Sequence, residues 1–580
     1  METIRKIRAS HCLPIAVVGA SRGARLVRWS ARGNGLIAFA ALVACYLLPG
    51  MIGHDPWKQD ETYIADIVRN MLDSGDWMVP TMAGAPFMEK PPLFYWVAAL
   101  CVRMSSPFLA PHDAARLATT LFLVGTCIAT AIAVRACWDG RHAKVGVLVL
   151  LSCLGLERYA HLMLTDFAML FGFGVAICGL LRSARYGQHA GLILGTGAGI
   201  AFMGKGLLGP GVLACSALML PLLFVQWRRR SYLRELWMGC LAALPWLTIW
   251  PMLLLGRSPE LLKEWIWANN IGRFLGFSVA ELGAAHPPWF WIENLPWIAL
   301  PGWPLALLTL WRRRGGAMND PAIQLALTLC AVLLLVLGCS ASARDNYALP
   351  ILLPLALLAA PAAESLPSTL DRWWACGACA LFGTMTIAVW TGWTSMMATG
   401  SVPDWPIVAN YLPSQFHPVF DAWRFAAALA ATAIPLWLAA SARVFRGYGL
   451  RCWFVGLSVT WASFAILWGP WIDAAKSYRS VFESVREALP PGVKCLSQSG
   501  LGESELAMLH YYLGMTATRA SSRHCGALLV EGPATRTPSV EAGGAQRLVW
   551  SGARPGDEDE RFWLIVERRT KPVGDLTTRR

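Results

Sequence analysis

Charged residues are scarce in this chain. Asp, Glu, Lys and Arg together make up 15% of its 580 residues, whereas hydrophobic residues make up 56%. Soluble domains carry about a quarter charged residues, so this composition excludes an ordinary soluble protein of such length. The mean hydropathy of +0.45 points the same way. The chain is therefore expected to be an integral membrane protein.

Signals for nucleotide and nucleic-acid binding are also missing. No basic soluble domain is evident, so the net charge of +14 does not indicate nucleic-acid binding. The run Gly199-x4-Gly204-Lys205 imitates a phosphate-binding loop, but Gly206 stands where that loop requires Ser or Thr. The alternate glycines at 195, 197 and 199 instead predict close helix packing.

Cysteine is sparse in the last part of the chain. Two of the 16 cysteines, Cys495 and Cys525, lie in the segment 471–580. An oxidising compartment would allow them to form a disulfide, although spacing alone leaves the pairing open. Cys376 and Cys379 lie in an apolar span, where helix packing is a better explanation than metal binding.

Long apolar blocks are what the chain has in abundance. Blocks approaching 20 residues match the hydrocarbon thickness of a bilayer at the rise of an α-helix. Such blocks occur at 36–52, 117–134, 207–225, 323–337 and 453–468. Many of the 29 tryptophans flank the blocks, where amphipathic rings favour the membrane interface. The pattern predicts an all-α polytopic membrane protein.

The distribution of positive charge predicts the orientation. Short breaks between apolar blocks on one side hold 23 of the 50 Lys and Arg, and breaks on the other side hold 12. The remaining 15 lie in 471–580, which translocates as a domain and does not count. This bias predicts a cytoplasmic N-terminus, about thirteen transmembrane helices and an external C-terminus. The short apolar stretch 93–104 then has to lie at the interface, or re-enter, without crossing.

Three parts follow along the chain. Residues 1–35 are expected to form a basic cytoplasmic arm, because arginines at 22, 25, 28 and 32 argue against a cleaved signal peptide. Residues 36–470 are expected to form the transmembrane domain, with residues 54–116 as its first external loop. Residues 471–580 are expected to form a small periplasmic α/β domain. Its predicted helices are 474–489 and 503–513, and its predicted strands are 493–496, 527–530, 547–550 and 562–566.

The first external loop carries the most informative residues. Asp60-Glu61 opens a stretch whose apolar residues recur at helical spacing, and Gly75 stands where such a helix would end. This pattern predicts a short amphipathic helix lying on the membrane. The two carboxylates could merely stabilise the helix dipole, but Glu89-Lys90-Pro91-Pro92 follows at the lip of the next apolar stretch. Ionised groups are costly to place there without a use, so the loop is a candidate for surface chemistry.

Seven short motifs occur in order on the side predicted to be external. They are Asp60-Glu61-Thr62-Tyr63, Ser74-Gly75-Asp76-Trp77, Glu89-Lys90-Pro91-Pro92-Leu93-Phe94-Tyr95-Trp96, Leu164-Thr165-Asp166, Met203-Gly204-Lys205-Gly206, Asn269-Asn270-Ile271-Gly272-Arg273-Phe274 and Tyr347-Ala348-Leu349-Pro350. Across most of residues 36–360 the chain thereby resembles the aminoarabinose (4-amino-4-deoxy-L-arabinose) lipid A transferase family. That family lies within the protein O-mannosyltransferase-like GT-C glycosyltransferases.

The resemblance implies a fold and a reaction. It implies a GT-C membrane fold and transfer of a sugar from undecaprenyl phosphate to an acceptor outside the bacterial inner membrane. In the aminoarabinose family that acceptor is a phosphate of lipid A. No nucleotide site is required, because the activated donor arrives through the bilayer.

The resemblance also implies roles for particular residues. The leaving group is a lipid phosphate, whose charge needs cations and a hydrogen-bond donor. The residues that would bind it are Lys90, Arg273, Lys205 and Tyr347. Asp60 is the first candidate for a general base or acceptor-orienting carboxylate, followed by Asp166 and Glu61.

A divalent metal ion is the only cofactor to consider. Glu89 is the candidate ligand, or else it orients Lys90. Some relatives place a histidine a few residues before the arginine of the fourth external loop, whereas Trp267, Ala268 and Asn269 stand here. This departure argues against zinc.

Other functions remain open. A lipid or glycan transporter would carry ionisable residues or broken helices near the bilayer midplane, whereas the candidates here concentrate in external loops. A membrane-anchored scaffold would leave Asp60 and Glu89-Lys90 unexplained. Among transferases, the acceptor could instead be a protein Ser or Thr or another envelope glycan. The expected partners are an undecaprenyl-phosphate-linked sugar, lipid A or another periplasmic acceptor, and membrane lipids, with no nucleic acid.

Overall fold

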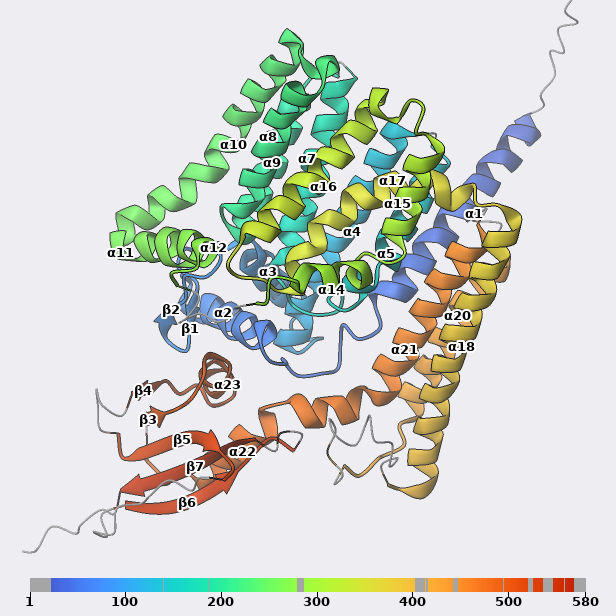
Figure 1. Ribbon diagram of the computed structural model, residues 1–580. Helices are drawn as coiled ribbons and strands as arrows, with labels where there is room; N and C mark the ends of the chain where they lie inside the picture. The colour runs from blue at the N-terminus through green and yellow to red at the C-terminus, as the bar shows by residue number, and fades with distance from the viewer. Residues whose placement is uncertain are drawn as a thin grey trace, which may run out of the picture.

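The computed structural model describes residues 22–567, apart from 139, 186, 279–285, 402–412, 414–415, 442–446, 494, 520–524, 536–545, 556 and 558. Residues 1–21 of the predicted cytoplasmic arm lie outside the described residues. The described chain forms a large helical part and a C-terminal sheet domain at one end of it (Figure 1).

Eight helical segments among the described residues are long and apolar enough to cross a membrane. They are α4 (Pro111–Cys137), α7 (Asp166–Ala184), α10 (Arg230–Arg257), α16 (Pro321–Cys339), η4 with α17 (Asp345–Ile351 and Leu352–Glu364), α18 (Ser368–Thr399), α20 (Ala422–Ser441) and α21 (Tyr448–Lys476). The chain is therefore a multi-pass integral membrane protein, as its composition predicts.

Helix α1 (Arg22–Leu47) precedes the long apolar segments, and shorter helices lie among them. These are α3 (Leu93–Ser105), α5 (His142–Ser152), α6 (Leu154–Glu157), α8 (Ala190–Lys205), α9 (Leu208–Leu223), η1 (Val225–Trp227), α14 (Phe290–Ile298), α15 (Gly302–Arg312) and η3 (Ala317–Asn319). A 16-residue helix such as α8 is about 24 Å long at the α-helical rise, a little less than the hydrocarbon core. The total of thirteen spans and the orientation therefore stay predictions.

The glycine series of α8 allows three helices to pack closely. A Cβ on Gly195 would lie 2.1 Å from the carbonyl oxygen of Gly239 on α10. A Cβ on Gly197 would lie 2.4 Å from the backbone nitrogen of Ala176 on α7. Backbone atoms cannot move aside, so only glycine permits these contacts. The prediction of helix packing is confirmed.

The predicted functional motifs gather at the end of the helical part that faces the C-terminal domain (Figure 1). The elements there are α2 (Asp60–Ser74), β1 (Thr81–Met82), β2 (Ala85–Pro86), α3, α11 (Pro259–Lys263), the π-helix η2 (Glu264–Gly272) and α12 (Arg273–Leu275). Helix α2 ends where the sequence predicts, because Gly75 adopts a left-handed conformation with φ 72°.

Protein rather than lipid covers the apolar face of α2. Ile64, Ile67, Val68 and Met71 are at most 3% exposed and belong to the main hydrophobic core, together with Phe94 of α3. Helix α2 also contacts α4 and, from the C-terminal domain, α23 (Glu503–Leu513). The periodicity predicts the helix correctly, but periodicity alone does not tell a face buried in protein from one buried in lipid. The helix itself is confirmed, its apolar face packs against protein, and its position on the membrane stays a prediction.

The C-terminal domain is a mixed five-stranded sheet with helices. The strand order is β4-β3-β5-β7-β6; β3 runs parallel to β4 and β5, and the other pairs are antiparallel. Its elements are α22 (Arg479–Ala488), β3 (Leu496–Ser499), α23 (Glu503–Leu513), β4 (Ala517–Arg519), β5 (Ala527–Pro533), β6 (Gln546–Gly552) and β7 (Glu560–Glu567). Strand β4 is absent from the sequence prediction. A disulfide joins Cys495 to Cys525, with the two Cα atoms 5.6 Å apart.

Candidate functional site

A small cavity brings together the residues expected to bind a lipid phosphate. It has a volume of about 420 Å³, and Lys90, Lys205, Arg273 and Tyr347 all line it. These residues come from four separate stretches of the chain. The cavity also has an apolar wall formed by Leu207, Leu208, Val212, Ile271, Phe274, Leu275, Val336 and Leu337. Cations beside a hydrocarbon surface are what a phosphate attached to a lipid chain requires.

Glu89 lies between two of these cations. It accepts a hydrogen bond from the Arg273 guanidinium, and its Oε2 lies 3.4 Å from Nζ of Lys90. Burial opposes the charge of Glu89, but Lys90 and Arg273 outweigh it and lower the pKa of this carboxyl to about 2. Glu89 is therefore ionised at neutral pH and holds both cations at the cavity wall.

Asp166 holds the third cation. Asp166 begins α7, Lys205 ends α8, and their side chains form an ion pair that is 3% and 7% exposed. The Lys205 ammonium also lies 3.9 Å from the centroid of the Tyr347 ring. Asp166 thus fixes Lys205, and Lys205 orders the Tyr347 ring.

A tight turn follows Lys205, and a side chain of η2, the helix that precedes Arg273, holds it. Gly206 has φ 87°, and a Cβ there would lie 2.3 Å from Oδ1 of Asn270. That oxygen accepts a hydrogen bond from the backbone N–H of Leu207 at 3.0 Å, while Nδ2 of Asn270 donates to the carbonyl of Trp265 at 2.8 Å. The asparagine therefore ties the end of α8 to η2.

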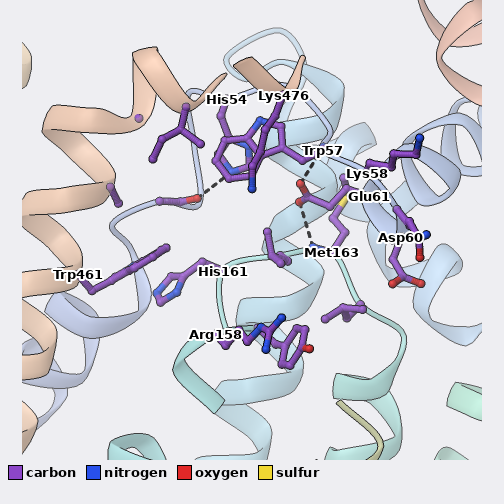
Figure 2. Close-up of a pocket in the computed structure, with 18 of the residues that line it drawn as sticks. His54, Trp57, Lys58, Asp60, Glu61, Arg158, His161, Met163, Trp461 and Lys476 are labelled. Atoms are coloured by element: carbon purple, nitrogen blue, oxygen red, sulfur yellow. Dashed lines mark hydrogen bonds between the residues drawn. The ribbon is translucent and has the colours of Figure 1, made fainter. Parts of the chain in front are cut away.

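A larger cavity of about 1400 Å³ has Asp60 in its wall (Figure 2). Within residues 22–567 as described, the Asp60 carboxylate makes no hydrogen bond or ion pair. Burial raises its pKa, although Lys90 and Arg344 act to lower it. The charges of Lys90, Glu89 and Asp166 all act on Asp60, so it lies within electrostatic reach of the small cavity. An unengaged carboxylate of raised pKa suits proton transfer.

Glu61, unlike Asp60, is hydrogen-bonded through both of its carboxylate oxygens. One of its oxygens accepts from Nε of Arg116 at 2.7 Å and from the N–H of Met163 at 3.1 Å, and the other accepts from the N–H of Trp57 at 3.2 Å. Figure 2 shows the bonds to Trp57 and Met163. Burial opposes its charge, but Arg116 outweighs this and the pKa of Glu61 is lowered. Such bonding suits a positioning residue beside Asp60.

Arg344 is a cavity residue that sequence reasoning missed. It lines the larger cavity three residues before Tyr347. The adjacent Asp345 accepts hydrogen bonds of 2.5 Å from the Tyr159 hydroxyl and from Arg158, which fixes the segment that carries Arg344. The Tyr347 motif could have drawn attention to Arg344, but no spacing rule pointed to it. The other cations lining this cavity are Lys58, Arg158, Arg424, Lys476 and Arg554.

The described residues offer Glu89 little help in binding a metal ion. Its oxygens face Arg273 and Lys90, and it belongs to no described group of three His, Cys, Asp or Glu at metal-ligand spacing. One such group does occur in the C-terminal domain, where ligand atoms of Glu505, Glu531 and Glu560 lie within 4.8 Å of one another. Carboxylates at that spacing could hold a hard cation. The Lys58 ammonium, however, already contacts two of the three.

Known proteins resemble the chain in sequence. A family profile described as dolichyl-phosphate-mannose-protein mannosyltransferase matches residues 34–258. Relatives named undecaprenyl phosphate-alpha-4-amino-4-deoxy-L-arabinose arabinosyl transferase occur in Serratia proteamaculans and Pseudomonas aeruginosa. The first is 28% identical over 58% of this chain and 60% of its own length. The second is 28% identical over 74% of each chain. The chain thus spans less than two thirds of the Serratia protein.

Solved structures resemble the chain in fold. The crystal structure of ArnT from Cupriavidus metallidurans bound to undecaprenyl phosphate superposes with a TM-score of 0.67 at 17% identity. The match covers 92% of this chain and 98% of that one, so the two share an overall fold. The region matched by the family profile contains Asp60, Lys90, Asp166 and Lys205. The chain is thus similar in sequence to the protein mannosyltransferase family over residues 34–258 and shares the fold of ArnT over most of its length.

Proposed function

We propose that this protein is a glycosyltransferase of the bacterial inner membrane that takes its sugar from undecaprenyl phosphate and works at the periplasmic face. The observation that carries the proposal is the small cavity, where Lys90, Lys205 and Arg273 converge beside an apolar wall. Asp60 lies within electrostatic reach of that cavity and borders a second, larger one. One cavity suits the donor and the other suits the acceptor.

The small cavity supplies what the departing group needs. When the bond between the anomeric carbon and the phosphate oxygen breaks, negative charge grows on that phosphate. Lys90, Arg273 and Lys205 stabilise this charge, and the Tyr347 hydroxyl donates a hydrogen bond to it. The apolar wall binds the first isoprene units of the lipid. Lys205 is already fixed by Asp166, so little reorganisation is needed during the reaction.

Asp60 acts on the acceptor. An acceptor oxygen entering from the larger cavity attacks the anomeric carbon, and the sugar–phosphate bond breaks on the opposite side. Asp60 takes the proton of that oxygen or fixes its direction of attack. A well-placed general base contributes roughly 100- to 10,000-fold to the rate. Glu61 and Arg116 hold the start of α2, from which Asp60 projects.

The names of the relatives suggest which sugar is transferred, and the charge of the larger cavity suggests which acceptor binds. The names of the curated relatives favour 4-amino-4-deoxy-L-arabinose as the sugar. Six Lys or Arg side chains line the larger cavity, and two of them, Arg344 and Lys476, have no carboxylate partner among the described residues. Together with the apolar and aromatic lining, these two cations suit an anionic amphiphile. Lipid A, whose phosphate would be the acceptor, has this chemistry. A protein Ser or Thr lacks such negative charge and is the second candidate.

Mass spectrometry of lipid A tests the proposal. A strain that makes the lipid-linked aminoarabinose but lacks this protein should gain lipid A with the mass of added aminoarabinose when the protein is expressed. Asp60→Asn and Lys90→Ala should each abolish the added mass while the protein remains folded in the membrane. Unmodified lipid A together with newly glycosylated periplasmic protein would instead favour the second acceptor. Near-normal transfer by both variants would disprove the assigned site.

A further inference from the structure

The C-terminal domain contacts the chain just before Asp60. Lys58 extends into the domain, where its Nζ lies 2.8 Å from Oε1 of Glu505 and 3.0 Å from Oε1 of Glu560. The two carboxylate side chains are 2% and 10% exposed and come from α23 and β7. Gln59 alone separates Lys58 from Asp60. The position of Lys58 is thus passed on to Asp60 through two peptide units.

The partners of Lys58 are themselves held in place. The Tyr478 hydroxyl donates a hydrogen bond to Glu505, and Nε of Arg554 donates to Oε2 of Glu560 at 3.1 Å. Partial burial opposes the charge of Lys58, but Glu505 and Glu560 outweigh it and raise the pKa of the ammonium. The ammonium is therefore charged at neutral pH and sits in a rigid, preformed pair of carboxylates.

Glu531 is the third carboxyl of the cluster that it forms with Glu505 and Glu560. Burial and the charges of Glu505 and Glu560 raise the pKa of Glu531 to about 8, so it is largely protonated at neutral pH. The two ionised carboxylates then face two cations, Lys58 and Arg554. Lys58 is the cation that the membrane part contributes, and without it one buried carboxylate would be uncompensated.

The same segment is fastened a second time upstream. Asp55 accepts from Oγ of Ser477 at 2.6 Å and from Nε of Arg479 at 2.9 Å. The indole N–H of Trp57 donates to Asp473 at 2.9 Å. The Asp60 carboxylate, in contrast, makes no hydrogen bond to any described residue. Its place in the site depends on the backbone that these contacts hold.

We propose that Lys58 is a positioning residue for the transfer reaction, and that its ammonium, held between Glu505 and Glu560, orients Asp60. The C-terminal domain on this view sets the geometry of the active site in addition to covering it. The inference rests on the proposed role of Asp60 in transfer. A misplacement of about 1 Å at a reacting group can cost roughly 100-fold in rate. A shift of Lys58, two residues before Asp60, is therefore expected to lower the rate of transfer.

Kinetics of purified full-length protein in detergent provide the first test. Lys58→Met keeps the apolar stem and removes the charge, and should lower kcat about 10- to 100-fold with the donor KM changed less than about threefold. Lys58→Arg should recover most of the lost kcat. Lys58→Met combined with Glu505→Gln should lose no more than Lys58→Met alone, because both changes break one contact.

A matched control separates positioning from domain docking in general. His510 on α23 lies 2.6 Å (Nδ1 to Oδ1) from the buried Asp66, two helical turns beyond Asp60 on α2. His510→Gln weakens the same interface and should leave kcat within about threefold of the unchanged protein. Equal losses of kcat in the His510 and Lys58 variants would overturn the proposal. A Lys58→Met effect confined to the acceptor KM would overturn it as well.

Amide hydrogen exchange gives a readout that does not depend on transfer. Peptides covering 55–62 should exchange faster in Lys58→Met than in the unchanged protein, and should not do so in His510→Gln. Unchanged exchange in Lys58→Met contradicts the positioning role even if the protein is a transferase. If the unchanged protein transfers no sugar but residues 55–62 still exchange faster in Lys58→Met, the proposed function is contradicted. The conclusion that Lys58 holds this segment then still stands.

Discussion

At the residue scale, the carboxylates of the site differ in whether a cation contacts them. Arg116 holds Glu61, Arg273 holds Glu89 and Lys205 holds Asp166. Asp60 has no such cation in contact among the described residues, and burial raises its pKa. A carboxylate already bonded to a cation is a poor proton acceptor, because the cation stabilises its ionised form. This difference is why Asp60 is assigned to the acceptor and the other three to holding neighbouring groups.

The pH dependence of transfer should depend on Arg344. In the proposed mechanism Asp60 works as a carboxylate, so kcat should fall as the pH falls through the pKa of Asp60 in the enzyme–substrate complex. The charge of Arg344 lowers that pKa. Arg344→Gln removes the charge, the pKa of Asp60 rises, and the acid limb of the kcat profile should move to higher pH. A profile measured from pH 4 to 9 would show the shift.

Arg424→Gln is the control for that shift. Arg424 lines the same cavity, but its Nε lies 3.5 Å from the Asp421 carboxylate, which compensates its charge, and among the described residues it makes no ion pair with the segment that carries Asp345. Its replacement should leave the acid limb where it is. A limb that stays fixed in Arg344→Gln, or that moves equally in both variants, would show that Asp60 is not the titrating group.

At the element scale, the motifs indicated which residues gather but not how they are held. Lys90, Arg273 and Lys205 were predicted from short motifs, and all three line one cavity. The ion pair between Asp166 and Lys205 joins the start of one helix to the end of the next, and periodicity says nothing about such a pair. Arg344 could not be predicted for the same reason. Its effect on Asp60 arises only because folding brings the two charges near each other.

The turn after α8 offers a test at this scale. Gly206→Ala would place a methyl group 2.3 Å from Oδ1 of Asn270, in a backbone conformation that L-residues rarely adopt. The change should cost roughly 1–3 kcal/mol of stability and raise the donor KM, since Asn270 positions the helix that leads to Arg273. Thermal unfolding in detergent and donor titration would measure both. Gly377→Ala on α18, where nothing lies within 4 Å of the new Cβ, should not lower the stability and should leave the donor KM unchanged.

At the scale of the whole molecule, hydropathy and charge predict a membrane protein. They do not predict the contacts between the C-terminal domain and the helical part. Apolar blocks gave the membrane helices, and alternation of strands and helices gave the C-terminal domain. The docking of that domain on α2 could not be foreseen, because Asp55 and Arg479 lie 424 residues apart. The same docking buries the α2 face that was expected to meet lipid.

The orientation can be tested with two cysteine probes. Gly315, between α15 and α16, and Glu487, on α22, are both exposed in the structure, so the side of the membrane alone should decide their labelling. In spheroplasts, an impermeant maleimide should react with Glu487→Cys and should spare Gly315→Cys until the membrane is broken. The unsubstituted chain serves as the background for its own cysteines. The reverse pattern would invert the proposed topology.

The bond from the Asp55 N–H to the Asp473 carboxylate spans 418 residues, and this has a consequence for how the protein is made. At about 5–20 residues per second, a ribosome needs roughly 20–80 s to supply the second partner after the first. Throughout that interval the loop that carries Asp60 lacks its partners from the C-terminal part. If Lys58 and Asp60 have the proposed roles, a product that stops before the C-terminal domain should be inactive. Activity would then report that translation has continued past Glu560.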